Sequence, residues 1–251
     1  MFLHWLVKIL RLTALLLLVI SLSGCLYWLR AYQTYLQLSD FDRYFSVKVA
    51  DSFTLYFNEP ILYNQDFVEL AKLYPSVDLP TATGGRRWRY VFHKVDINNK
   101  ALKPEVTFYA DLDFNADKRL ISWSFSSLFL QIAPPQFLEI SLRSIAGASI
   151  DKDKKQLKAN ADSLGKISAE LPTQTAVLAK LGEPLEIKDE PEQETYLYRF
   201  LLDSPRIEAG YENNTLNEVK LSFDKKNHAL FNMAGNFAGL KIAIDYRKFL
   251  K

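Results

Sequence analysis

The sequence predicts an α+β fold: two tandem small units, each with a helix packed on an antiparallel sheet, that follow an N-terminal anchor segment. Three observations favour this class. Aromatic residues make up 14% of the chain and gather in alternating segments, a composition typical of strands. Helical patterns that end near prolines separate these segments. The order of patterns in the first half of the chain recurs in the second half.

The chain begins with the pattern of a secretory signal. Lys8 and Arg11 supply positive charge, and the first 13 residues contain no acidic side chain. The segment Leu12–Gly24 is uncharged and rich in leucine. A basic start, an apolar middle of about 7–15 residues and a small-residue end predict a signal peptide over residues 1–24.

The signal segment ends in a short motif that contains a cysteine. Leu22, Ser23, Gly24 and Cys25 resemble the lipobox of bacterial lipoprotein precursors. The resemblance implies cleavage before Cys25, a thioether-linked diacylglycerol on its sulfur and an acylated new N-terminus. Cys25 is the single cysteine of the chain, and lipidation would cap a thiol that has no internal disulfide partner.

A transmembrane helix is the alternative for this segment. The uncharged run continues to Leu29, which gives about the 18 residues of a candidate span, and Tyr27 and Trp28 suit a membrane interface. Both alternatives place residues 30–251 on the periplasmic side of a bacterial envelope. Leu26 follows the cysteine where enterobacterial lipoproteins of the inner membrane carry Asp, so the lipobox resemblance favours the outer membrane over the inner one.

The predicted boundaries divide the chain into five parts. They are a signal peptide (1–24), a lipidated N-terminus with a helical tether (25–49), a first α+β unit (50–131), a helical linker (132–166) and a second α+β unit (167–251). The tether contains a helix over Tyr32–Phe45, for which two interpretations stand. We favour a helix packed on the domain, and the alternative is a helix whose aromatic residues lie on lipid.

Helices and strands follow one another in the same order in both units. The first unit has a helix over Gln65–Leu73 and strands over 53–57, 87–95, 105–114 and 120–125. In the linker, two prolines at 134–135 open a helix over Phe137–Ile145. The second unit has a helix over Gln174–Leu181 and strands over 195–202, 207–211 and 218–223, with a last strand from Ala229.

An internal repeat relates the two units. At an offset of 108 residues, Leu70, Leu73, Tyr90 and Phe92 match Leu178, Leu181, Tyr198 and Phe200. At an offset of 109, Leu112 and Phe114 match Leu221 and Phe223. One inserted residue explains the change of offset, and a long period of this kind indicates a duplicated structural unit.

Several short motifs mark residues 167–231. They are Pro172–Thr175, Val177, Leu181–Pro184, Tyr196–Tyr198 and Leu221–Asp224. A Thr-capped helix that ends in Leu-Gly-x-Pro, a Tyr-containing strand and a Phe-Asp strand end resemble the BamE (SmpA/OmlA) lipoprotein family, although the first unit lacks the Leu-Gly-x-Pro motif. Thr173 or Thr175 can cap the helix, and Gly182 permits a left-handed exit. The resemblance implies small α+β units and, by analogy alone, a role in docking and stabilising envelope proteins.

Candidate catalytic or metal-binding chemistry is sparse. Oxygen-bearing residues from Asp111 to Asp117 have the spacing of a calcium loop, but Ala116 and Ser122 stand where that loop needs Gly and Glu. The common motifs of hydrolases, metalloproteases and nucleotide-binding proteins are absent from the sequence. We therefore expect no catalytic residue, no metal and no cofactor.

Three arginines form the cationic group with a candidate role. Alternation places Arg87 and Arg89 on one face of a strand and Trp88 on the other, and Arg86 precedes them. A solvated strand face is the favoured interpretation, and contact with anionic lipid or lipopolysaccharide is the alternative. With 31 basic and 29 acidic residues the chain is nearly balanced, so we expect no nucleic-acid partner.

These patterns predict a non-catalytic envelope lipoprotein, a protein-binding or scaffold module on the periplasmic side. Its expected partners are the membrane, through the N-terminal lipid, and an envelope protein that adds a strand to an exposed sheet face or edge. One alternative is a periplasmic lipid- or small-ligand-binding protein whose aromatic strands line a cavity. Another is a single-span inner-membrane protein with the same soluble part.

Overall fold

A computed structural model describes residues 26–251 except 148, 152–155, 159–165 and 238–239. The predicted signal peptide and the lipobox residues Leu22, Ser23, Gly24 and Cys25 lie outside the described residues, so cleavage and lipidation stay predictions. Within the described part of the chain, no helix is both long enough and apolar enough to cross a membrane.

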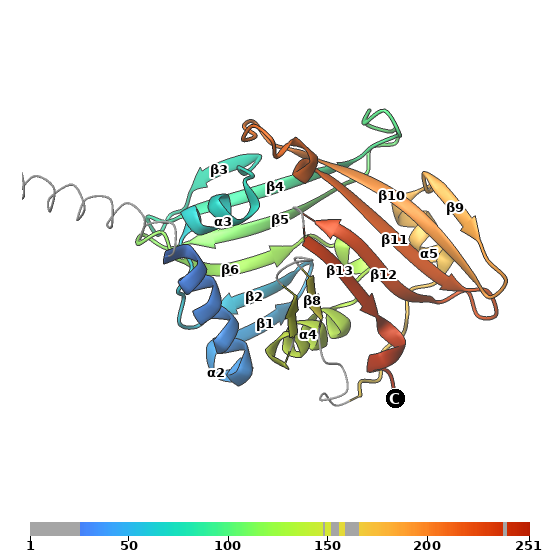
Figure 1. The fold of residues 1–251 in the computed structure, drawn as a ribbon, viewed down its shortest axis with the longest axis horizontal. Coiled ribbons are helices and arrows are strands. Elements are labelled where there is room, and N and C mark those ends of the chain that lie inside the picture. Colours follow the sequence, from blue (N-terminus) through green and yellow to red (C-terminus); the bar gives the residue numbers. More distant parts are fainter. Residues whose placement is uncertain (1–25, 148, 152–155, 159–165, 238–239) are drawn as a thin grey trace, which may run out of the picture.

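Strands from both halves of the chain form one 13-stranded sheet. They are β1 (Phe45–Val49), β2 (Phe53–Phe57), β3 (Val77–Pro80), β4 (Arg86–Lys94), β5 (Thr107–Phe114), β6 (Leu120–Phe125), β7 (Ser149–Asp151), β8 (Gln156–Lys158), β9 (Glu186–Asp189), β10 (Gln193–Asp203), β11 (Leu216–Asp224), β12 (Leu230–Phe237) and β13 (Leu240–Asp245). The order is β1-β2-β6-β5-β4-β10-β11-β12-β13-β8-β7, with β3 beside β4 and β9 beside β10. The sheet is strongly curled (Figure 1).

Short helices accompany the sheet. Residues 26–37 are helical, and further α-helices are α2 (Phe41–Tyr44), α3 (Asn64–Ala71), α4 (Pro135–Ser144) and α5 (Gln174–Leu181). Single 3-10 turns are η1 (Leu38–Asp40), η2 (Phe129–Gln131), η3 (Ile145–Gly147), η5 (Glu212–Thr215) and η6 (Tyr246–Phe249). Thr173 caps α5 as predicted, because its hydroxyl accepts a hydrogen bond from the nitrogen of Ala176 at 3.2 Å. Gly182 ends α5 at a φ of 67°.

The predicted fold of two helix-on-sheet units is wrong, because the strands of both halves belong to one sheet. β4 of the first half pairs directly with β10 of the second half, from Val91 opposite Asp203 to Lys94 opposite Phe200. β3 pairs with Arg86–Arg89 and leaves the second part of β4 to β10. An unpaired strand edge is a site of non-specific association, and the pairing of β4 with β10 removes two such edges.

The strand registers reproduce the offsets of the predicted repeat. Trp88 lies opposite Leu112, and Tyr196 lies opposite Leu221, at offsets of 108 and 109 residues. The elements α3–β3–β4–β5–β6 recur in order as α5–β9–β10–β11–β12. The repeat therefore predicts the order of the helix and the longer strands in each half, whereas it misses β3 and β9, and the separation into two sheets is wrong.

One face of the sheet is apolar and carries the helices. The main core joins strands of both halves to α4 and α5, and its largest fully buried side chains are Phe53, Phe137, Tyr198, Phe200, Phe223 and Tyr246. A smaller core under α3 consists of Val68, Trp88, Leu112, Phe114 and Leu120. On the opposite face charged side chains lie across from one another, as at Arg87 and Asp113.

Sequence patterns missed several edge elements. β3 and β9 consist of four exposed residues each, so the alternation of buried and exposed side chains that signals a strand is absent from them. Residues 207–211, predicted as a strand, form a turn with one bridge between Ile207 and Leu73. The segment predicted as one helix over Tyr32–Phe45 is already helical at residue 26, the first described residue, and it gives way to β1 at Phe45.

Candidate functional site

A half-buried ion pair holds the helix of residues 26–37 on the body of the molecule. Arg30 donates from Nε and Nη2 to the two carboxylate oxygens of Asp66, at 2.7 and 2.5 Å. The Asp66 side chain is 1% exposed, and it accepts a further hydrogen bond from the nitrogen of Tyr63 at 2.8 Å. The hydrogen bonds from Arg30 to Asp66 raise the pKa of Arg30. The inner face of the helix is thereby fixed to the start of α3.

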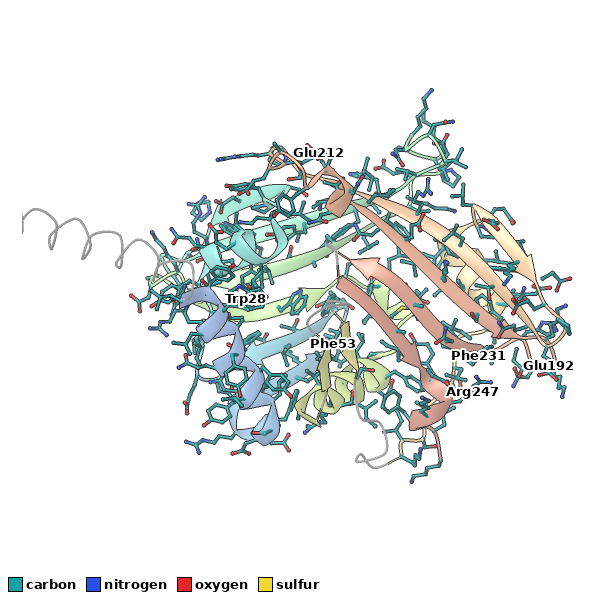
Figure 2. The ribbon with its side chains drawn as sticks, viewed as in Figure 1. Trp28, Phe53, Glu192, Glu212, Phe231 and Arg247 are labelled. Atoms are coloured by element: carbon teal, nitrogen blue, oxygen red, sulfur yellow. The ribbon has the colours of Figure 1, made fainter. Side chains whose placement is uncertain are left out.

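The outer face of the same helix is apolar. Its exposed large hydrophobic side chains are Leu26, Trp28, Leu29, Tyr32 and Leu36. At about 100° per residue, they occupy an arc of roughly 160° that excludes Arg30 and includes one exposed polar residue, Gln33. Trp28 is 62% exposed near the beginning of the helix (Figure 2). An exposed, largely apolar stripe of this kind marks a contact surface.

The three arginines with a predicted role each pair with a carboxylate. Arg86, Arg87 and Arg89 pair with Asp78, Asp113 and Asp111, at nitrogen–oxygen distances of 2.6, 2.6 and 2.7 Å. The Arg89 guanidinium also lies 3.9 Å from the centre of the Tyr109 ring. An anionic lipid would compete with these carboxylates for the same donors. Contact with an anionic surface through this group therefore stays a prediction to which the geometry adds no support.

The calcium-like spacing around Asp111 has a structural explanation. Asp111 and Asp113 lie on β5, and each accepts two hydrogen bonds from a guanidinium of β4. Within the described ranges, no group of three or more His, Cys, Asp or Glu side chains is placed to hold a metal ion. The carboxylates serve cross-strand pairing on a half-exposed face.

The aromatic side chains of the apolar face pack against one another. Phe92 and Phe108 stack at 4.7 Å between ring centres, and Phe200 meets Phe108 edge-on at 5.0 Å. On the α4 side, Phe137 and Tyr246 lie 4.7 Å apart. These contacts lie on the face where the alternative function, a ligand carrier, would place its cavity, and that alternative stays a prediction.

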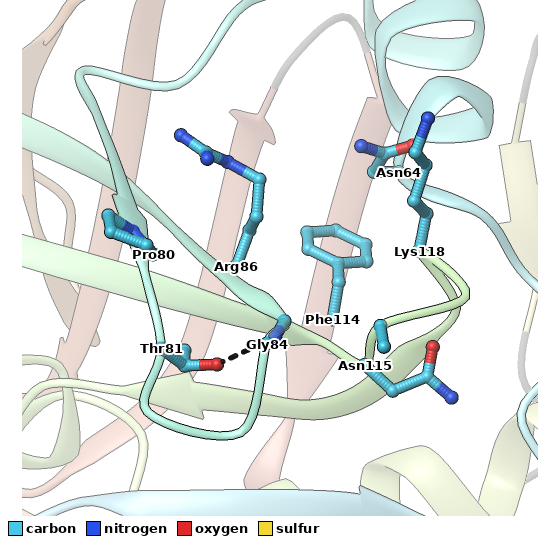
Figure 3. A pocket seen from close by; sticks show the side chains of 10 residues that line it. Asn64, Pro80, Thr81, Gly84, Arg86, Phe114, Asn115 and Lys118 are labelled. Carbon is cyan, nitrogen blue, oxygen red and sulfur yellow. Dashed lines mark hydrogen bonds between the residues drawn. The ribbon is translucent and has the colours of Figure 1, made fainter.

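A small surface hollow of about 220 Å³ lies between the β3–β4 turn, the β5–β6 turn and the start of α3 (Figure 3). Thr81 Oγ1 accepts a hydrogen bond from the Gly85 nitrogen at 3.0 Å. Gly85 needs to be glycine, since a Cβ there would lie 2.0 Å from the carbonyl oxygen of Phe114. Arg86 and Lys118 are the cationic residues that line this hollow. A second hollow, of about 320 Å³, lies at the start of α5. The first is smaller than the roughly 300–1,000 Å³ of typical ligand pockets.

Two of the short edge strands of the sheet, β3 and β9, differ in character. β3 exposes Val77 and Leu79, which are 39% and 52% exposed. β9 exposes Ile187, but Lys188 and Asp189 beside it lie in ion pairs. Charged side chains on an edge discourage the addition of a further strand, whereas apolar ones permit it. β3 contains one charged residue, Asp78, and β9 contains three, so β3 is the better of these two edges for binding.

Lys94 joins the two halves in a way that sequence reasoning missed. Its Nζ donates to the carbonyl oxygens of Leu181 and Glu183, both at 2.6 Å, and lies 5.2 Å from the centre of the Tyr198 ring. The residue is 6% exposed, and burial lowers its pKa. One sequence signal could have identified Lys94 as a buried residue. Alternation along β4 places it on the same face as Phe92.

The second half holds the end of α3 in return. Asn214 Nδ2 donates to the carbonyl of Ala71 at 3.1 Å, and the Ser204 hydroxyl donates to the carbonyl of Tyr74 at 2.9 Å. Each half thus satisfies carbonyl groups at, and just beyond, the C-terminal end of the other half's helix.

Comparisons with known proteins identify no relative. No family model, no curated protein and no solved structure matches the chain. The resemblance to the BamE family consequently stays a prediction based on the motifs of the second half.

Proposed function

We propose that this chain is a lipid-anchored, non-catalytic envelope protein that binds a protein partner on the periplasmic side by strand addition to β3. The observation that carries the proposal is the exposed apolar edge of β3, with Val77 and Leu79. In binding of this kind, main-chain hydrogen bonds supply affinity and alternate side chains supply specificity.

The surroundings of β3 suit a pre-formed binding edge. The strand is held by four residue pairs with β4, from Val77 opposite Arg89 to Pro80 opposite Arg86. The turn that follows is fixed by a 3.0 Å hydrogen bond from the Thr81 nitrogen to the Gly85 carbonyl. An edge that is already ordered loses little conformational entropy when a partner strand adds to it.

Site-specific crosslinking tests the binding edge. A photo-crosslinking amino acid replaces Leu79 in the full chain, expressed in bacterial envelopes, and the matched control carries it at Ile187 on β9. We expect a protein adduct from position 79 that is strongly reduced at position 187 and abolished by Val77→Lys. Equal adducts from both positions, or none from position 79, would contradict strand addition at β3.

The anchor needs a separate test, because Cys25 lies outside the described residues. The intact mass of the membrane-extracted protein is compared with that of a Cys25→Ala variant. We expect a wild-type mass that lacks residues 1–24 and carries acyl chains, with the variant unprocessed. An uncleaved, unacylated wild-type mass would favour the single-span alternative.

A further inference from the structure

The helix of residues 26–37 has two faces of opposite character. The inner face carries Arg30, bound to the buried Asp66, and Gln37, whose Nε2 donates to the Glu59 carbonyl at 3.0 Å. The outer face carries the exposed stripe of Leu26, Trp28, Leu29, Tyr32 and Leu36. Figure 1 shows the helix running past the ends of β6, β2 and β1, so the helix lies along one side of the molecule.

The chain that precedes this helix indicates what covers the stripe. Residues 12–24 are uncharged and apolar, and Cys25 adjoins the first described residue of the helix. No flexible polar tether separates the anchor segment from the helix, since residues 26–37 are helical from their first described position. A lipid anchor at Cys25, as proposed above, brings the first turn of the helix to the membrane surface.

The composition of the stripe distinguishes a helix that lies along the membrane from one that stands upright on it. At about 1.5 Å per residue, Tyr32 and Leu36 lie about 10 and 17 Å along the axis from residue 25. An upright helix would place both in water, where an apolar stripe has no favourable contact. Trp and Tyr are also the side chains enriched at the headgroup level of membranes.

We infer that the outer face of residues 26–37 lies flat on the lipid surface and that the Arg30–Asp66 pair transmits this orientation to the sheet. An in-plane amphipathic helix buries its apolar face at the boundary of headgroups and acyl chains. Because the helix is bound to α3, the sheet is held in a fixed orientation relative to the membrane. The inference rests on the anchor of the proposed function and is independent of strand addition at β3.

An environment-sensitive fluorophore tests this orientation. The full, processed chain is reconstituted in vesicles of phosphatidylethanolamine and phosphatidylglycerol, with NBD attached at Leu36→Cys. Ile97→Cys, in the exposed turn between β4 and β5, is the matched control. Lipids with a nitroxide near the headgroup act as quenchers. We expect blue-shifted emission at position 36 and quenching several-fold stronger than at position 97.

Each other outcome has a definite meaning. Equal, weak quenching at positions 36 and 97 overturns the inference, and quenching at Trp28→Cys alone shows an upright helix. A blue shift at position 36 without lipid quenching assigns the stripe to a second protein copy, and it also overturns the inference. Val77→Lys separates the two proposals, because it should abolish the partner adduct and leave lipid quenching at position 36 unchanged.

Discussion

The carbonyl groups at the C-terminal ends of α3 and α5 need hydrogen-bond donors, and the two helices receive them from side chains of different chemistry. Carbonyls at the end of α5 accept hydrogen bonds from one buried ammonium, that of Lys94. At the end of α3, the neutral side chains of Asn214 and Ser204 do the equivalent work. A charged donor makes the stronger hydrogen bonds but costs more to bury. The two halves therefore share an order of elements while they depend on each other through unequal contacts.

We expect the largest effect on stability at the C-terminal end of α5, where the donor is the Lys94 ammonium. Lys94→Met keeps the apolar stem of the side chain and leaves the carbonyls of Leu181 and Glu183 without their donor. We expect the free energy of unfolding to fall by about 3 kcal/mol. Asn214→Ala, the matched change at the end of α3, should cost about 1 kcal/mol. Urea unfolding of both variants measures the difference, and equal costs would break the comparison.

The N-terminal ends of the two helices also differ in charge, with an ionic group at one and a neutral group at the other. At α3 the Asp66 carboxylate is held by Arg30 and by the Tyr63 nitrogen, whereas α5 begins with the Thr173 hydroxyl. Arg30→Met leaves a buried carboxylate without its cation, and we expect a loss of about 2 kcal/mol, moderated by the partial exposure of Arg30. A double-mutant cycle with Asp66→Asn measures the coupling, and strictly additive costs would contradict a shared interaction.

Removal of the neutral cap should have a smaller effect. Thr173→Ala deletes the oxygen that accepts the hydrogen bond from the Ala176 nitrogen. We expect the free energy of unfolding to fall by about 1 kcal/mol, and Thr173→Ser should retain most of the stability. Thermal or urea unfolding of the pair checks this. A serine variant as unstable as the alanine variant would show that the hydroxyl is not the stabilising group.

The difference between local and distant interactions explains what the sequence could predict. The bounds of α5 follow from signals within a few residues, namely Thr173, Gly182 and Pro184, and the structure confirms the predicted range. The pairing of β4 with β10 joins residues more than 100 positions apart, as at His93 and Leu201. Nothing local encodes that contact, so two sheets were predicted where the chain builds one.

The same distinction applies to the candidate surfaces. Alternation correctly placed Arg87 and Arg89 on the face opposite Trp88, but their carboxylate partners lie on another strand. The β3 edge was missed because its exposed residues lack a periodic pattern. Helical spacing alone is enough to find the outer face of residues 26–37. It does not reveal that Arg30, on the inner face, pairs with the distant Asp66.

The smallest effects come from two tyrosines at matching positions of the repeat, and they should have opposite signs. The Tyr198 hydroxyl donates to the Gly182 carbonyl at 3.1 Å, whereas the buried Tyr90 hydroxyl has no hydrogen-bond partner among the described residues. Tyr198→Phe should lower the free energy of unfolding by about 0.5–1 kcal/mol. Tyr90→Phe should raise it by a similar amount, since it removes a polar group buried without a partner. Equal signs in urea unfolding would break this comparison.

The pH dependence of stability provides a second measurement on the same tyrosine pair. Burial raises the pKa of both Tyr90 and Tyr198 above the ordinary value of about 10. The folded state therefore keeps phenol protons that the unfolded state releases. The contribution of these protonated tyrosines to the free energy of unfolding is fully present below pH about 10, and it is lost as the pH rises above that value. Each Phe variant should flatten the alkaline fall in the free energy of unfolding by a similar amount, because desolvation is the largest cause in both halves. A fall that is unchanged in the Tyr90→Phe protein would show that this hydroxyl reaches water, and the predicted gain in stability from its removal would then disappear as well.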